Sequence, residues 1–294
     1  SFYQKLSALV LKRKKNLDGD KLLFICPSPK ELPLIFQVPN IRKQFKFVAA
    51  WVIDSFWVDR IPRTIQASNY FDHFFITSEE DIPEWQRITQ CTVSWLPWGT
   101  DALGLGGDNR DRKWDLRRVG RQPIEWDDDQ LTEHACKENN IFFKGRPESM
   151  DSSMQNQSSL MAVYQQSKFV LAFSNIANPT GYTHPIRSYL TGRWTDTLAC
   201  GGIVAGVAPT DPSMSKLLWD GATLELGSIK REEGLLIIKE AIKNWTPEQA
   251  TYNYKQSLQR LDWRWRFVEI AKLFEEQPQS LIDEIKLLEQ KIKQ

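Results

Sequence analysis

The 294-residue chain has few of the side chains that metal and thiol chemistry require: three histidines and four cysteines. No two cysteines form a CxxC pair and no two histidines have the spacing of a metal-binding pair, so a zinc site is not indicated. The motifs GxSxG, HExxH and Walker A are missing, and so is the early GxGxxG of dinucleotide-binding folds. Hydrolase and nucleoside triphosphatase classes therefore lack support, and we expect neither a metal nor a bound cofactor.

Long apolar runs and an excess of one charge are also absent. No stretch approaches the roughly 20 apolar residues of a membrane span. The formal net charge is only +1, so no global field favours nucleic acid. The scattered cysteines and the lack of a signal peptide favour the cytoplasm. An amphipathic helix is expected at 2–15, where it either docks on the chain or contacts a membrane surface peripherally.

What the sequence does contain is a regular alternation of short apolar runs and polar, helix-compatible segments. Helices are expected at 127–138, 152–166, 185–200, 212–219 and 230–244, and throughout the chain beyond 246. Strands are expected at 22–26, 47–53, 74–77, 92–96, 116–119, 141–143, 169–173, 203–207 and 223–226. Such alternation is typical of α/β domains with parallel sheets. We predict two doubly wound Rossmann-like domains facing a cleft, followed by a helical C-terminus.

A break in this alternation sets the expected domain boundaries. Turn residues at 97–101 precede three glycines and a charged run at 108–113, a composition typical of a linker and hinge. We expect an N-terminal domain at 1–101, a linker at 102–114, a nucleotide-binding domain at 115–260 and terminal helices at 261–294. Apolar residues at 281–292 follow a 4-3-4 spacing. They either join two copies weakly or pack on the body of the chain.

The run 192–205 joins a helix carrying a carboxylate to a glycine pair and an apolar strand. Gly201 and Gly202 allow a sharp turn between the two elements. Asp196 is expected to face the mouth of the sheet, where open α/β folds bind ligands. Its carboxylate can accept both hydrogens of a ribose diol. The run therefore predicts a nucleotide site.

Glycine and arginine residues near two expected strand ends and helix starts can bind an anion. Gly120 lets the backbone approach a ligand, and Arg121 can hold a diphosphate through its forked guanidinium, although a loop arginine is also an ordinary surface residue. Arg187 and Arg193 lie near a helix N-terminus, which favours anions. Their six-residue separation does not place both on one helix face, so one of the two is expected to reach a phosphate.

Other candidates are polar residues that follow strands. Ser174 and Asn175 are either ligand contacts or turn formers, and His184 is either a ligand contact or a structural histidine. Asp54 ends a strand of the first domain and can take a proton from an attacking hydroxyl, or it caps the next helix. The triplet at 127–129 contains a DxD pattern, but it opens an expected helix, and capping explains it.

Four motifs, found in order along roughly residues 21–275, resemble segments of GT-B glycosyltransferases, most closely the family 1/4-like and CgeB-like spore-protein groups. The pattern G-x-x-x-(D/E)-x-x-A-C-G at 192–201 is similar to their donor-binding helix. The segment 96–101 is similar to the one that ends their first domain. The turn at 119–121 resembles the glycine-arginine turn that opens their second domain, and 261–267 resembles a helix near their C-terminus.

The resemblance implies metal-independent transfer of a sugar from a nucleotide-sugar donor to a saccharide, lipid-linked or other hydroxyl acceptor. By motif match, Asp196 would hold the ribose, Arg121 the diphosphate, and Gly201 and Gly202 would shape the turn. The chain departs from the pattern because an aspartate replaces glutamate at 196 and Tyr189 stands where many relatives carry a second acid. The alternative is a degenerate GT-B module that binds nucleotide or carbohydrate, or acts as a scaffold, in polysaccharide assembly.

Overall fold

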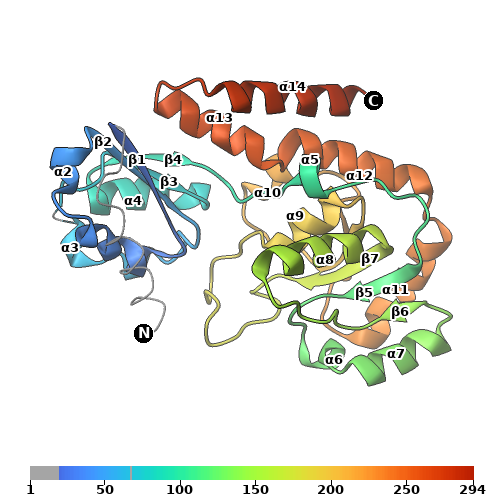
Figure 1. The fold of residues 1–294 in the computed structure, drawn as a ribbon. Helices are drawn as coiled ribbons and strands as arrows, with labels where there is room; N and C mark the ends of the chain where they lie inside the picture. The colour runs from blue at the N-terminus through green and yellow to red at the C-terminus, as the bar shows by residue number, and fades with distance from the viewer. Residues whose placement is uncertain (1–19, 67) are drawn as a thin grey trace. The chain divides into compact units, whose positions relative to one another are not determined.

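The computed structural model describes residues 20–66 and 68–294, and the chain divides into two compact units between Pro97 and Trp98. The first unit contains a parallel four-stranded sheet in the order β1-β2-β3-β4 (Figure 1). Its strands are β1 (Lys21–Cys26), β2 (Phe47–Val52), β3 (His73–Ile76) and β4 (Thr92–Trp95). Its helical segments are η1 (Pro29–Gln37), α2 (Ile41–Gln44), η2 (Val58–Arg60), α3 (Arg63–Gln66), η3 (Glu79–Asp81) and α4 (Ile82–Thr89).

The second unit contains a parallel five-stranded sheet in the order β6-β5-β7-β8-β9. Its strands are β5 (Trp114–Arg118), β6 (Phe143–Lys144), β7 (Ser167–Phe173), β8 (Ile203–Val207) and β9 (Thr223–Glu225). Its helices are α5 (Ala102–Leu105), α6 (Ile124–Asp127), α7 (Asp129–Glu138), α8 (Ser153–Gln165), α9 (Gly192–Ala199), α10 (Met214–Leu217), α11 (Arg231–Lys243), α12 (Pro247–Arg260), α13 (Trp263–Leu273) and α14 (Gln279–Lys293). The expected alternation of strands and helices is confirmed.

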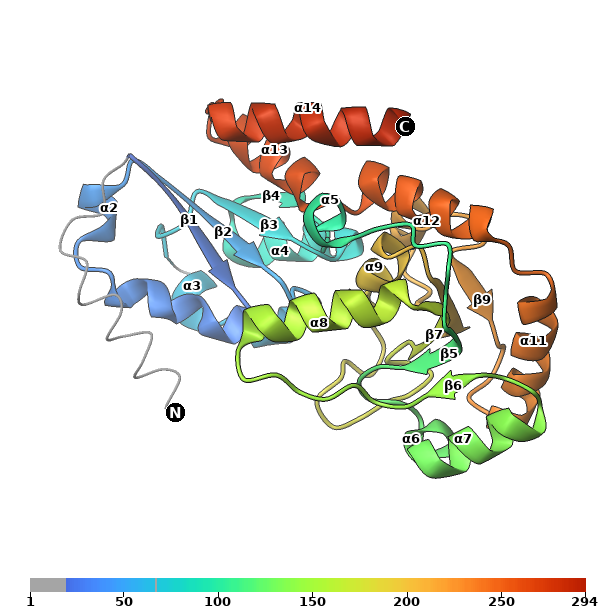
Figure 2. The same cartoon turned by 45° about the vertical axis from the view of Figure 1, so that its right-hand side comes forward.

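Both faces of the second sheet are covered by helices, as a doubly wound fold requires. On one face, Leu116 and Phe169 pack with side chains of α6, α7 and α11. On the other, Val119 and Val170 pack with side chains of α5, α8, α9, α12 and α14. Figure 2 shows α8 and α12 separated from α6 and α7 by the strands. Because the strands are parallel, their carboxyl ends meet at one edge, and this edge holds most of the candidate residues.

The expected linker at 102–114 is instead packed inside the second unit. Ala102 is fully buried, and the backbone nitrogen of Leu103 donates to the carboxylate of Asp262 at 2.8 Å. The buried guanidinium of Arg112 donates to backbone carbonyls of residues 164, 167 and 200. Glycine and charged residues suggested a flexible connection. In the structure, the charge of Arg112 instead fixes this segment against three other parts of the unit.

One expectation for a helix also changes. The helix expected at 185–200 begins only at Gly192, because the preceding residues are held in an irregular loop described below. The tail beyond 246 is helical, as expected, and is divided into three helices: Asp262 caps α13 by accepting from the backbone nitrogen of Arg264, and Glu275, with a φ of 53°, interrupts the chain before α14. Figures 1 and 2 both show α13 and α14 side by side.

The apolar stripe of α14 packs on its own unit. Leu288 is fully buried, and Ile285 and Ile292 lie against the same cluster as Tyr254 and Leu258 of α12. Of the two alternatives for 281–292, the structure therefore shows packing on the body of the chain. The amphipathic segment expected at 2–15 lies outside the described residues. Within residues 20–294, leaving out 67, no helix has both the length and the apolar character needed to cross a bilayer.

Replacement of Gly201 by alanine should lower the free energy of unfolding by about 1–3 kcal/mol. Gly201 has a φ of +72°, and an added Cβ would lie 2.7 Å from the carbonyl oxygen of Ala250. Urea unfolding of the two proteins measures the difference. Gly181→Ala is the matched control, because a Cβ at 181 would meet no atom within 4 Å. An equal decrease in the free energy of unfolding in both variants would show that a side chain at 201 does not strain the turn.

Candidate functional site

Gly120, Arg121 and Arg193 come together at the carboxyl edge of the second sheet. Gly120 follows β5 with a φ of +68°, and the Arg193 side chain passes 3.7 Å from where a Gly120 Cβ would lie. Arg193 stands in the first turn of α9, and its Nη1 donates to the carbonyl oxygen of Arg121 at 2.7 Å. The left-handed turn at Gly120 therefore seats one arginine directly beside the other; we call Arg121 and Arg193 the arginine pair.

No carboxylate in the described part of the chain forms an ion pair with the arginine pair. Arg121 donates instead to the Thr180 hydroxyl at 2.5 Å, and its guanidinium lies 4.9 Å from the centre of the exposed Tyr182 ring. Burial lowers the pKa of Arg193, and the positive charge of Arg121 lowers it further. Two adjacent cations at a helix N-terminus have the charge that favours binding of an anion.

A loop at 174–191 covers this edge and is ordered by side-chain hydrogen bonds. Asn175, which is 4% exposed, donates from Nδ2 to the carbonyl oxygens of His184 at 2.9 Å and of Arg187 at 2.7 Å. His184 Nδ1 accepts from the backbone nitrogen of Arg187 at 2.9 Å, and the Ser174 hydroxyl accepts from the backbone nitrogen of Ala177 at 3.3 Å. In the structure, these polar residues shape the loop, which in turn brings Thr180 to Arg121.

Asp196 lies one turn further along α9, and both of its carboxylate oxygens already accept hydrogen bonds. Thr100 donates to Oδ1 at 2.7 Å and Gln157 of α8 donates to Oδ2 at 3.1 Å. Burial raises the pKa of Asp196, and these two donors counteract part of that shift. A carboxylate oxygen has a second lone pair, so the existing bonds orient the group and leave acceptor capacity for a diol.

Gly201 and Gly202 do not join the other candidates. They precede β8, so they lie at the amino edge of the sheet, opposite the edge where Gly120 and the arginine pair meet. The positive φ of Gly201 lets the chain turn closely past Ala250, and a Cβ on Gly202 would lie 2.9 Å from Thr197. The predicted role in shaping the turn fits this geometry, whereas a contact with a ligand at the carboxyl edge does not.

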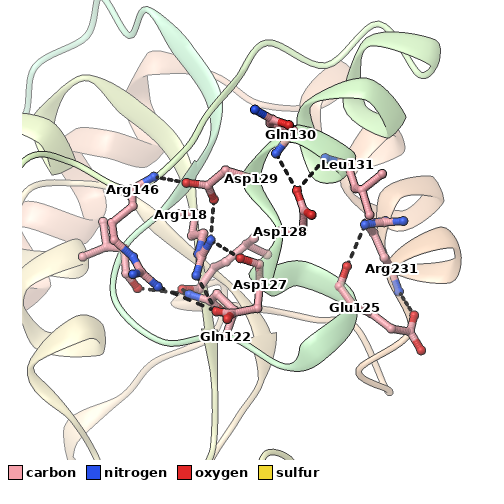
Figure 3. A network of polar contacts seen from close by, with 12 residues as sticks. Arg118, Gln122, Glu125, Asp127, Asp128, Asp129, Gln130, Leu131, Arg146 and Arg231 are labelled. Carbon is pink, nitrogen blue, oxygen red and sulfur yellow. Dashed lines mark hydrogen bonds and ion pairs between the residues drawn. The ribbon is translucent and has the colours of Figure 1, made fainter.

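The acidic triplet at 127–129 is engaged with arginines and backbone amides. Asp127 and Asp129 both accept hydrogen bonds from the buried guanidinium of Arg118, the latter at 2.5 Å (Figure 3). Asp128 caps α7 by accepting from the backbone nitrogens of Gln130 and Leu131. The triplet therefore neutralises a buried charge and starts a helix.

Asp54 belongs to the first unit, where it follows β2. It is half-buried, and its backbone nitrogen donates to the carbonyl oxygen of Pro27 at the end of β1 at 2.7 Å. Burial raises the pKa of its carboxyl, the negative charge of Glu31 raises it further, and Lys30 opposes both effects. A carboxylate with a raised pKa at a strand end has the properties of a general base.

Comparison with known proteins supports the fold. No family model and no curated protein sequence matches the chain. Among solved structures, the pneumococcal O-GlcNAc transferase GtfA in complex with UDP and GlcNAc is similar with a TM-score of 0.56 at 15% identity, over 99% of this chain and 61% of GtfA. The chain thus spans less than two thirds of GtfA.

Two further structures agree. Anabaena HepE in complex with UDP has a TM-score of 0.56 at 12% identity, over 92% of this chain and 82% of HepE. Sucrose-phosphate synthase from Thermosynechococcus elongatus has a TM-score of 0.55 at 11% identity, over 93% of this chain and 76% of the synthase. The fold is that of the GT-B glycosyltransferases, as the sequence motifs predicted. Membership of the CgeB-like group stays a prediction.

Four residues of the site were missed by the sequence analysis: Thr180, Tyr182, Gln157 and Thr100. Thr180 and Tyr182 lie in a stretch that was expected to lead into a helix, and no sequence spacing ties them to Arg121, 59 positions away in the case of Thr180. Gln157 and Thr100 reach Asp196 from 39 and 96 positions away. The only signal in the sequence for Gln157 was a polar residue one turn into the expected helix. Polar residues are common on helix surfaces, so this signal does not indicate a site.

Replacement of Asn175 by alanine should release the loop without unfolding the sheet. Two hydrogen bonds are lost, worth together about 1–3 kcal/mol, so the amides of 184–187 should exchange with deuterium at least tenfold faster. Hydrogen exchange read by mass spectrometry measures this. Asn178→Ala serves as the control, because the Asn178 side chain makes no hydrogen bond to the described residues. Unchanged protection at 184–187 would contradict the role of the two Asn175 hydrogen bonds in holding the loop.

Proposed function

We propose that this chain is a glycosyltransferase that moves a sugar from a nucleotide-diphosphate donor to a hydroxyl of a saccharide or lipid-linked acceptor, without a bound metal. The observation that carries the proposal is the arginine pair, two adjacent guanidiniums with no carboxylate partner among the described residues. GT-B structures similar to this one are described as complexes with UDP. A nucleoside diphosphate is therefore the anion that we assign to the pair.

The chemistry follows from where the charge develops. When the glycosidic bond breaks, negative charge grows on the leaving diphosphate. Arg193 stands in the first turn of α9 and passes 3.7 Å from where a Gly120 Cβ would lie. In this proposal the arginine pair and the N-terminus of α9 stabilise this charge. This arrangement supplies positive charge that a divalent cation supplies in other transferases, and it is our reason for proposing metal independence.

In this proposal, Asp196 holds the ribose and Asp54 serves the acceptor. Asp196 is already oriented by Thr100 and Gln157, which lowers the cost of fixing it on a diol. Asp54 takes the proton of the attacking hydroxyl if the configuration at the sugar inverts, and orients the acceptor if it is retained. The neighbouring Glu31 and Lys30 set how readily it accepts that proton.

We further propose that the protein works in the cytoplasm. Its four cysteines, Cys26, Cys91, Cys136 and Cys200, are all free thiols, and this state persists in a reducing compartment. Burial raises the pKa of Cys136 to about 12, so this thiol is unreactive at neutral pH. A peripheral membrane contact through 2–15 is part of the proposal for a lipid-linked acceptor.

A second candidate function is a nucleotide-binding module without turnover. The engagement of both Asp196 oxygens by protein donors favours it, because a carboxylate that only fixes Thr100 and Gln157 would leave the ribose unheld. The two candidates differ in one observable. Without an acceptor, the transferase slowly hydrolyses a UDP-sugar, because water takes the place of the acceptor and the products are UDP and the free sugar. The module binds the same compound and leaves it intact.

The first experiment is a thermal-shift screen of the chain against UDP, GDP, ADP, CMP and dTDP, each with and without magnesium. We expect a rise in melting temperature with one nucleotide, insensitive to magnesium, because bound ligand stabilises the folded state. Arg193→Gln should weaken binding of that nucleotide by about 1.5–3 kcal/mol through loss of charged hydrogen bonds. Arg110→Gln, at an exposed arginine paired with Glu248, is the control. The proposal fails if no nucleotide binds, or if both variants bind like the parent.

The pH dependence of nucleotide release tests Asp54, with a sugar derivative of the nucleotide that the screen selects as the substrate. A general base must be ionised, so activity falls as the pH drops through its pKa, and the raised pKa places this acid limb above the ordinary range of an aspartate. Glu31→Gln removes a nearby negative charge and should move the limb to lower pH. Lys30→Gln removes the opposing positive charge and should move it to higher pH. If the acid limb of the pH–activity profile stays at the same pH in both variants, the limb reports the ionisation of a group other than Asp54.

A further inference from the structure

Arg117 is a buried cation without a hydrogen-bond partner. It lies on β5, is 6% exposed, and its Nε meets no acceptor in the described structure. No ion pair or hydrogen bond joins its guanidinium to another described residue. Burial lowers the pKa of this guanidinium, and only the more distant charge of Asp129 opposes that shift. Burying an unpaired guanidinium costs free energy. A ligand that pairs with Arg117 would offset this cost.

The other buried arginines of the second unit have acceptors. Arg112 donates to three backbone carbonyls, and Arg266 donates to the carbonyl of Trp98 at 3.2 Å. Arg118, the next residue on β5, points to the opposite face and is held by Asp127 and Asp129, as Figure 3 shows. The second oxygen of Asp129 accepts from the backbone nitrogen of Arg146 at 2.9 Å. Asp129 therefore binds Arg118 and the Arg146 amide, and it forms no hydrogen bond with Arg117 in the described structure.

A second cation stands beside Arg117. In the parallel pairing of β5 with β6, Arg117 is the register partner of Lys144, and paired residues on adjacent strands project from the same face. Like charges placed opposite each other destabilise a sheet. Lys144 is exposed, and its ammonium lies 5.9 Å from the Trp114 ring. Its flexible four-carbon stem can bring the charge to a ligand on Arg117.

We propose that Arg117 and Lys144 form an oxyanion site on the outer half of the second sheet, distinct from the arginine pair, for a carboxylate, sulfate or phosphate group of a substrate. Both residues lie at the carboxyl ends of their strands, the edge where ligands of open α/β sheets bind. A buried guanidinium binds a planar carboxylate or a tetrahedral oxyanion through paired hydrogen bonds, and the lysine adds a mobile charge.

Two sources can supply this group: an acidic sugar on the donor, or a separate acidic ligand. Assignment to the donor rests on the proposed function, whereas the site itself does not. Inorganic sulfate tests the site alone, because it needs no nucleotide. The pair UDP-glucuronate and UDP-glucose tests the donor, because these compounds differ by a carboxylate on the sugar.

The test measures melting temperature in sulfate against chloride of equal ionic strength. We expect sulfate to stabilise the parent chain and to have no specific effect on Arg117→Leu. Without sulfate, Arg117→Leu should melt roughly 2–4 °C higher than the parent, since an unpaired buried charge is removed. Lys144→Gln, at an exposed position, should lose at least half of the sulfate response and keeps the test decisive if the leucine variant does not fold. Lys43→Gln, at an exposed lysine of the first unit, should respond like the parent.

A sulfate response that survives unchanged in Arg117→Leu and Lys144→Gln would overturn the site. If sulfate acts through these residues, about tenfold tighter binding of UDP-glucuronate than of UDP-glucose, lost in Lys144→Gln, assigns the oxyanion to the donor sugar. Equal binding of the two UDP-sugars supports a separate acidic ligand. If neither UDP-sugar binds, the proposed function fails while the sulfate result still decides this site.

Discussion

Positive charge placed at the carboxyl edge of the second sheet is the constraint on which the rest of this unit depends. Arg118 lies there at 2% exposure, and its burial is tolerated because Asp127 and Asp129 neutralise it. Those two carboxylates in turn fix α6 and the start of α7 against β5. The arginine pair lies at the same edge and is not neutralised by the chain. The fold neutralises one buried arginine with two aspartates and leaves the arginine pair without a carboxylate, and this difference is the basis of our proposal that the pair binds an external anion.

Much of the fold could be predicted from the sequence because its elements are set locally. Apolar runs such as 47–52 form strands that are buried on both faces. A short continuous apolar run is typical of such strands in a parallel sheet. The turn at Gly120 and Arg121 was predicted for the same reason, since a glycine after a buried strand marks the turn to the next helix, and Gly120 has a φ of +68° there. These predictions needed only the order of residues within one strand-turn-helix unit.

The predictions that failed depended on partners far away in the sequence. The segment 102–114 has the composition of a linker, but Arg112 finds three carbonyls from elements more than 50 positions further on. The helix expected from Pro185 is delayed to Gly192 because Asn175 binds the intervening backbone. Gly201 and Gly202 were grouped with the ligand site since they follow the helix of Asp196. A helix carries its two ends to opposite edges of a sheet, and the sequence does not show which end faces the ligand.

The aspartates of the DxD pattern at 127–129 also have their partners elsewhere in the chain, and these partners bear on metal binding. Asp127 and Asp129 both form ion pairs with the buried guanidinium of Arg118, so a metal ion on these carboxylates would compete with that arginine. Freeing them for a cation would leave the Arg118 guanidinium buried and unpaired, at a cost of several kcal/mol. The same replacement would place a divalent cation close to Arg117, whose charge already interacts with that of Asp129. This balance of charges supports our proposal that arginines, and not a metal ion, are the partners of a diphosphate in this unit.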